Sequence, residues 1–124
     1  MPKFARKDVR IKPERGAVEV EVICGFAQHI RFVAELFDDQ GNNPQTVNTG
    51  SSLGTDPPPF HLNLIPSQLS GRFLMITADV FHLGITDKFQ VDVVFRQANE
   101  EIDRMMLDGT FTDNVSISFV ARFQ

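Results

Sequence analysis

The sequence has no tryptophan, no tyrosine and only one cysteine among its 124 residues, yet it has twelve phenylalanines. A phenylalanine ring carries no polar group, so it suits a dry core better than a wet recognition surface. The absence of Trp and Tyr therefore disfavours a carbohydrate-binding module, because such surfaces usually depend on those two residues. The single cysteine, Cys24, excludes a disulfide within the chain.

Long apolar runs are also absent. The sequence has no stretch of about 18 consecutive apolar residues, so we expect no membrane-spanning helix. The charged start, residues 1–7, is not followed by the apolar segment of a secretory signal. Together with the low cysteine content, these features predict a cytoplasmic protein.

The charges are unevenly distributed along the chain. Residues 1–15 carry six basic and two acidic groups, a net charge of +4, whereas residues 16–124 carry six basic and fourteen acidic groups, a net charge of −8. A basic leading segment on an acidic body can bind an acidic partner or a second copy of the same body. It can also be an edge strand whose charges discourage aggregation.

Alternation of apolar and polar residues is the main structural signal, and it predicts half-buried β-strands. The clearest strands are expected at residues 17–24, 29–37, 72–83, 88–96 and 115–123, with weaker ones at 9–11 and 60–64. We predict an all-β fold, an antiparallel β-sandwich of about eight strands, with residues 1–124 forming a single domain.

Three segments are less regular. Residues 65–71 predict a short helical turn, because Pro66 presets the backbone and Gly71 ends it. Residues 99–108 fit either a short helix or a hairpin that leads into another strand, and we favour the hairpin. Residues 38–59 form a long irregular stretch that would carry the chain from one sheet to the other, with a short edge strand at 46–48.

An acidic turn begins this irregular stretch. Asp38 and Asp39 precede Gly41 and two asparagines, a concentration of the oxygen ligands that Ca²⁺ prefers. Asp56, Asp87 or Asp113 could add ligands if their loops lay at the same end of the sandwich. Ordinary turn chemistry explains the same residues without any metal.

The sequence shows no arrangement typical of catalysis or nucleic-acid binding. Cys24 continues an apolar alternation, and the three histidines, His29, His61 and His82, have no metal-binding or triad spacing. There is no glycine-rich phosphate loop, and the acidic chain lacks stacking aromatics among its basic residues. We therefore expect neither an enzyme nor a nucleic-acid-binding protein, and no catalytic residues are assigned.

Apolar residues on the outward side of several strands are the most informative feature. A sheet face in contact with water should be polar, so something is expected to cover this one. The cover is either a segment of the chain, 38–59 or 98–109, or another protein molecule. The residues concerned are Val33, Phe37, Phe73, Met75, Phe81 and Val94.

These observations favour a non-enzymatic interaction or assembly module that associates with itself or with another protein through this apolar face. The alternative is a Ca²⁺-dependent sandwich that binds a ligand or a membrane surface through Asp38, Asp39, Asp56 and Asp113. An enzyme of unidentified class is the remaining interpretation. We expect no cofactor, apart from the Ca²⁺ of this alternative.

Overall fold

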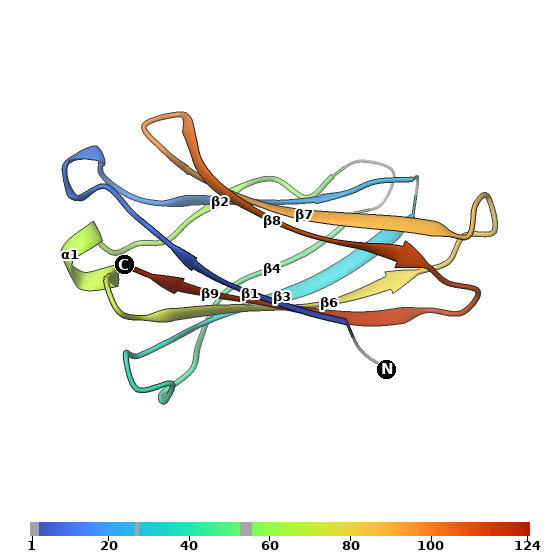
Figure 1. Ribbon diagram of the computed structural model, residues 1–124, viewed down its shortest axis with the longest axis horizontal. Helices are drawn as coiled ribbons and strands as arrows, with labels where there is room; N and C mark the ends of the chain where they lie inside the picture. The colour runs from blue at the N-terminus through green and yellow to red at the C-terminus, as the bar shows by residue number, and fades with distance from the viewer. Residues whose placement is uncertain (1–2, 27, 53–55) are drawn as a thin grey trace.

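The computed structural model describes residues 3–26, 28–52 and 56–124, and β-strands dominate it (Figure 1). The strands lie in two sheets, one with the order β1-β9-β6-β3-β4 and the other with the order β5-β2-β7-β8. This arrangement confirms the predicted all-β, sandwich-like fold. The strands are β1 (Lys3–Val9), β2 (Glu19–Cys24), β3 (His29–Phe37), β4 (Gln45–Ser51), β5 (Phe60–His61), β6 (Phe73–Phe81), β7 (Lys88–Gln97), β8 (Glu100–Thr110) and β9 (Val115–Phe123).

The two sheets bury the apolar set of each strand between them. The side chains predicted to face inward on β3, β6, β7 and β9 are nearly all inaccessible to solvent, as Phe32, Ile76, Val91 and Phe119 illustrate. The buried side chains of both sheets form one cluster. Because side chains alternate between faces along a strand, burying one set fixes which residues face outward.

The N-terminal strand departs from the prediction. β1 pairs with β9 in parallel, with Lys3 opposite Ile117 and Val9 opposite Phe123, while every other strand pair described is antiparallel. The sandwich is therefore not purely antiparallel, and its described residues form nine strands, close to the predicted number of about eight. The predicted strand near Val9 and Ile11 ends at Val9, and both of these side chains are buried.

Residues 99–108 are not helical, and the hairpin that we favoured is confirmed. Ala98 and Asn99 adopt positive φ angles of 51° and 63°, and together they form the two-residue turn between β7 and β8. Two successive left-handed residues characterise the type I′ turn, whose twist matches that of the strands it joins. The register shifts between Phe95 and Arg96, directly before the turn.

The irregular segment 38–59 contains more regular structure than predicted. Its edge strand, β4, extends over Gln45–Ser51, and a bulge interrupts its pairing with β3 between Ala34 and Glu35. After β4 the chain crosses to β5 in the other sheet, as expected. The helical turn predicted at 65–71 is α1 (Pro66–Leu69), and a 3-10 turn, η1 (Pro13–Arg15), lies between β1 and β2.

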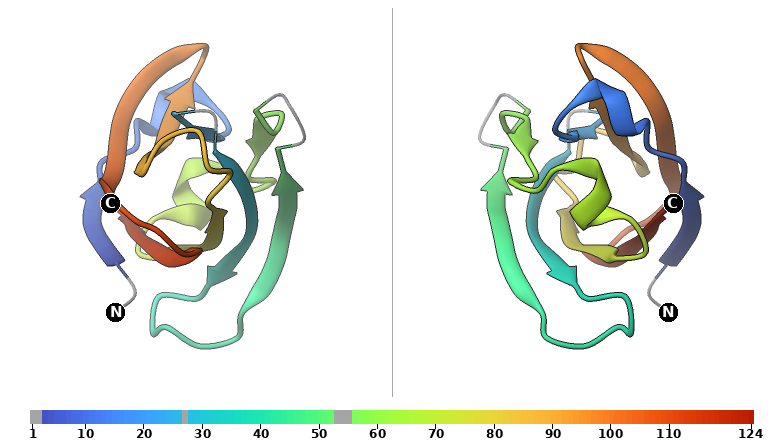
Figure 2. Two further views of the ribbon diagram at one scale, coloured as in Figure 1. Left: turned by 90° about the vertical axis from the view of Figure 1, so that its right-hand side faces the viewer. Right: turned by 90° about the vertical axis from the view of Figure 1, so that its left-hand side faces the viewer.

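The two long sides of the sandwich differ. On one side β1 lies beside β8, although they belong to different sheets, and on the other side β4 is the outermost strand (Figure 2). Because β1 and β9 run in the same direction, the two chain ends lie toward opposite ends of the molecule (Figure 1). No helix among the described residues is long and apolar enough to cross a membrane.

Candidate functional site

The five-stranded sheet brings together five of the six predicted interface residues. Val33 and Phe37 lie on β3, and Phe73, Met75 and Phe81 lie on β6, all pointing away from the core. Phe37 is directly opposite Phe73 in the ladder. We call the side of this sheet that faces away from the core the five-stranded outer face.

Four apolar side chains are neighbours at one end of this face. Phe73 pairs with Phe37, Met75 pairs with Val120 of β9, and Met75 follows Phe73 on the same side of β6. Each of the four is half-buried. Cross-strand neighbours on one face are within reach of aromatic and long side chains, so this set, the Phe73 cluster, is one continuous apolar surface.

Arginine side chains partly cap the phenylalanines of the five-stranded outer face. The guanidinium carbons of Arg6 and Arg122 lie 6.0 and 5.7 Å from the centre of the Phe73 ring. At the other end of β6, the guanidinium carbon of Arg31 lies 5.8 Å from the centre of the Phe81 ring. Guanidinium groups lie over aromatic rings because the ring face is negative, so these arginines cover part of the apolar surface.

Neither segment predicted to cover this face does so in the described residues. Residues 98–109 form the β7–β8 turn and most of β8, which belongs to the other sheet. Within residues 38–59, β4 extends the same sheet sideways, and the described residues after it lead to β5 (Figure 2). Two large side chains on the face are well exposed, Phe4 at 61% and Val33 at 39%.

A shallow hollow of about 590 Å³ lies on the same face, beside the edge strand. Its apolar part on this face is formed by Val33, since the side chain of the neighbouring Phe32 is buried in the core. Its polar part includes Arg31 and Asp79, whose charged groups are 3.8 Å apart. The hollow has the size of a small-molecule site, and it could also hold one or two partner side chains.

Val94, the sixth predicted interface residue, lies elsewhere. It belongs to β7 in the other sheet, and it is completely buried although it points away from the core. Its cross-strand neighbours are Glu21 of β2 and Arg104 of β8. Charged side chains cover Val94, so its apolar character does not mark a second exposed patch.

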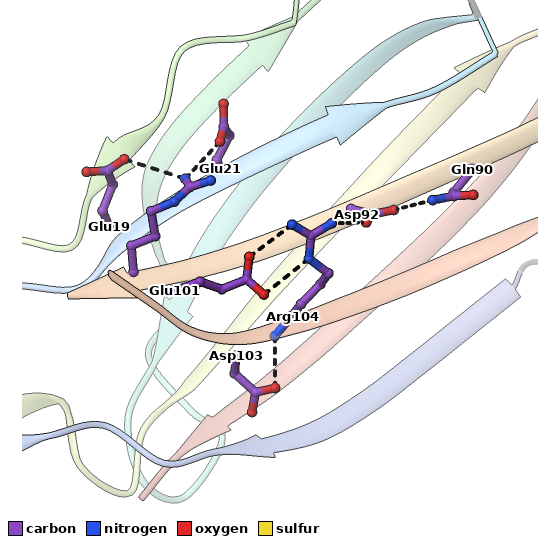
Figure 3. A network of polar contacts seen from close by, with 8 residues as sticks. Glu19, Glu21, Gln90, Asp92, Glu101, Asp103 and Arg104 are labelled. Atoms are coloured by element: carbon purple, nitrogen blue, oxygen red, sulfur yellow. Dashed lines mark hydrogen bonds and ion pairs between the residues drawn. The ribbon is translucent and has the colours of Figure 1, made fainter. Parts of the chain in front are cut away.

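The cover over Val94 is a network of ion pairs across β2, β7 and β8 (Figure 3). Arg96 contacts Glu21 at 2.8 Å and Glu19 at 3.8 Å. Arg104 contacts Asp92 at 2.6 Å and Glu101 at 2.9 Å. The pKa of the Glu101 carboxyl is lowered, chiefly by its hydrogen bond from Arg104. We call this side of the sheet the four-stranded outer face.

The four predicted calcium ligands do not come together. Asp38 and Asp39 follow β3, at the end of the sheet where β6 begins, whereas Asp113 precedes β9 at the end where β6 finishes. Asp56 accepts a hydrogen bond from the main-chain N–H of Cys24, whose strand ends near the start of β3. Among the described residues, no three His, Cys, Asp or Glu side chains are grouped as a metal site.

Asp38 has a local structural role. Its carboxylate accepts hydrogen bonds from the main-chain N–H groups of Gln40 and Asn42 and from the side-chain amide of Asn43. These bonds lower the pKa of the Asp38 carboxyl, and the bond from Asn42 contributes most. Turn chemistry therefore accounts for this aspartate.

No catalytic arrangement is found among the described side chains. Burial raises the pKa of the Cys24 thiol to about 11, so it is a poor nucleophile at neutral pH. His82 lies 2.9 Å from Asp87 and packs against Phe111, but no described serine, threonine or cysteine side chain bonds to its ring. His61 instead lies 3.5 Å from Glu19 on the four-stranded outer face.

The basic N-terminal segment binds the acidic body of its own chain. Lys7 forms an ion pair of 2.6 Å with Asp103 of β8, and Arg15 pairs with Glu100 at the start of the same strand. The Lys3 ammonium group donates a hydrogen bond of 2.7 Å to the main-chain oxygen of Asp108. These contacts join the two sheets along the β1–β8 side. Three of the six basic residues of segment 1–15 therefore have partners within the same chain.

The sequence analysis missed an apolar tip at one end of the sandwich. Phe26, in the loop between β2 and β3, is 47% exposed, while Leu83 and Ile85, in the loop between β6 and β7, are 55% and 73% exposed. The buried side chain of Gln28 ties the two loops together by bonding Leu83 N and the main-chain oxygens of Thr86 and Lys88. The signal in the sequence was the short run Leu83-Gly84-Ile85, which has no polar residue.

Comparison with known proteins gives no further guide. No protein-family model, no curated protein and no solved structure matches this chain.

Proposed function

We propose that the chain is a non-enzymatic interaction module that associates with a second copy of itself through the five-stranded outer face. The observation that carries this proposal is the Phe73 cluster: four neighbouring, half-buried apolar side chains on β3, β6 and β9, which the side chains of Arg6 and Arg122 cap only in part. Apolar surfaces that span several strands commonly mark protein interfaces.

The charges of this face also suit self-association. Arg6, Arg31 and Arg122 are matched in number by Asp8, Glu35 and Asp79, so two copies would not meet as like-charged surfaces. Full burial of an apolar side chain contributes about 1.5–3 kcal/mol. Because the cluster is already half-buried and association has its own entropic cost, we expect weak dimers, with a Kd of roughly 1–100 μM.

Sedimentation equilibrium of the Phe73→Glu variant tests the proposal. The new carboxylate would lie beside Arg6 and Arg122, so the fold should persist, as a thermal melt would verify. We expect the wild-type protein to dimerise with increasing concentration and the variant to bind itself at least about tenfold more weakly.

The matched control is Met106→Glu, since Met106 is 46% exposed on β8 of the other sheet. This variant should dimerise like the wild-type protein. A wild-type protein that stays monomeric up to about 1 mM, or equal losses in both variants, would contradict the proposal.

A second candidate function is binding to a lipid surface through the apolar tip. Three large apolar side chains on two loops that Gln28 holds together would enter the interfacial region of a bilayer without first having to be ordered. This version of the membrane hypothesis does not need the four aspartates to form one calcium site.

Co-sedimentation with phosphatidylcholine vesicles, with and without anionic lipid, tests this second candidate. Ile85→Glu should abolish binding, whereas Ile65→Glu, at another exposed apolar residue next to α1 at the opposite end, should not. Parallel samples with EDTA and with Ca²⁺ separate metal-dependent from metal-independent binding. Absence of the wild-type protein from all vesicle pellets would exclude this candidate.

A further inference from the structure

Strand β4 is an unprotected sheet edge. It lies at the end of the five-stranded sheet and pairs only with β3 among the described strands. Its sequence, Gln-Thr-Val-Asn-Thr-Gly-Ser, contains no charged residue and no proline. An exposed edge of this kind offers unpaired main-chain N–H and C=O groups to any extended chain.

The other sheet edges are protected in ways that natural proteins commonly use. β5 has only two residues, which is too short to add a further strand. β8 carries Glu100, Glu101, Asp103, Arg104 and Asp108, and it lies beside β1. β1 is itself rich in lysine and arginine, and its lysines bond to β8. Among the described residues, a bulge in its pairing with β3 is the one such device found on β4.

The alternation of hydrogen bonds along β4 identifies which of its main-chain N–H and C=O groups do not bond to β3. The main-chain N–H of Ser52 donates to the oxygen of Ile30 at 2.9 Å, which places this pair among the hydrogen-bonded pairs of the β3–β4 ladder. In an antiparallel ladder such pairs alternate with pairs whose N–H and C=O groups point away. Thr49 and Ser51 belong to the pairs whose main-chain groups point away from β3, and both residues are exposed.

We infer that β4 pairs antiparallel with β4 of a second copy, through the main-chain groups of Thr49 and Ser51. Two-fold symmetry requires an antiparallel arrangement of two identical strands. The absence of charge on β4 means that self-pairing brings no like charges together, whereas the charged strands β1 and β8 would repel their own copies. The joined sheets would contain ten strands.

This contact differs from the one made by the five-stranded outer face, and either can exist without the other. If both form, each molecule has two distinct two-fold contacts, and the assembly grows as an open chain of alternating interfaces. Oligomers larger than a dimer are then expected at high concentration. If only the β4 contact forms, the assembly stops at a dimer.

Hydrogen exchange at several protein concentrations tests the inference directly. The amides of Thr49 and Ser51 should exchange quickly in dilute solution and at least about tenfold more slowly at high concentration, because only pairing with a second copy occupies them. Exchange of these two amides that does not depend on concentration would overturn the inference. The Phe73→Glu variant should retain the slow exchange of these two amides, because Phe73 belongs to the five-stranded outer face and not to the β4 contact.

Thr49→Pro and Thr49→Val form a matched pair of variants. Proline removes the outward N–H, and since that group does not bond to β3 the fold should persist. Valine keeps the N–H and favours extended structure. We expect Thr49→Pro to lose the concentration-dependent protection at Ser51 and Thr49→Val to keep it. Equal protection at Ser51 in the proline variant would contradict pairing at this edge.

Discussion

The two outer faces of the sandwich differ in how far they bury an apolar residue that points away from the core. Val94 on the four-stranded outer face is completely buried under ion-paired side chains from three strands, whereas Val33 on the five-stranded outer face is 39% exposed. Both valines interrupt a polar alternation in the sequence. The difference comes from their cross-strand neighbours: Glu21 and Arg104 flank Val94, while Thr49 and Thr77 flank Val33. Long charged side chains can cover an apolar residue with their aliphatic parts, and threonines are too short to do so.

The largest effect is expected from placing a carboxylate at each valine in turn. Val94→Asp should lower the free energy of unfolding by about 3 kcal/mol or more, because it buries a charge among arginines that already have partners. Val33→Asp should change it by less than about 1 kcal/mol, since that site is solvent-accessible. Urea unfolding of both variants measures the difference. Similar losses in the two would mean that the ion-pair network does not bury Val94.

A smaller effect is expected from removing the arginine at the centre of the network. Arg104→Met keeps the aliphatic cover over Val94, but it leaves the nearly buried Asp92 carboxylate with only Gln90 as a partner. The urea midpoint should fall. Adding Asp92→Asn to this variant should restore part of the loss, because the unpaired charge is then removed. No restoration in the double variant would show that the loss does not come from the unpaired Asp92 carboxylate.

The smallest expected effect is a dependence of stability on pH, which arises from Glu101 on the four-stranded outer face. The pKa of Glu101 in the folded chain is below its ordinary value of 4.5, so its ion pair contributes stability above that pH and loses it as pH falls through the folded pKa. Glu101→Gln should therefore be slightly less stable than wild type at pH 7, and the difference should shrink as the pH falls below 4.5. Thermal melts from neutral to acidic pH test the expectation. A difference that does not shrink as the pH falls would assign the effect to lost packing.

The strand faces were predictable from the sequence, because burial of one apolar set fixes each strand's orientation. The covering of Val94 was not, since it depends on Glu21 and Arg104, which lie on strands whose register no local pattern reveals. The β7–β8 turn was only partly predictable, because its first residue is Ala98, and alanine seldom adopts a positive φ. Five residues of the predicted interface lie on one face of one sheet, as the strand alternation indicated. The apolar tip could not be predicted, because its residues belong to two loops that only the fold brings together.

The parallel pairing of β1 with β9 also affects how the chain reaches its folded state. β1 lies near the start of the sequence and its only ladder partner near the end, so a chain emerging from a ribosome exposes β1 long before β9 is available. During that interval Phe4 and the open backbone of β1 could pair with other nascent chains. The lysines and arginines of β1 make such pairing unfavourable. We therefore expect the basic segment to keep an unpaired strand soluble before the protein is folded. In the folded protein the same segment links the two sheets.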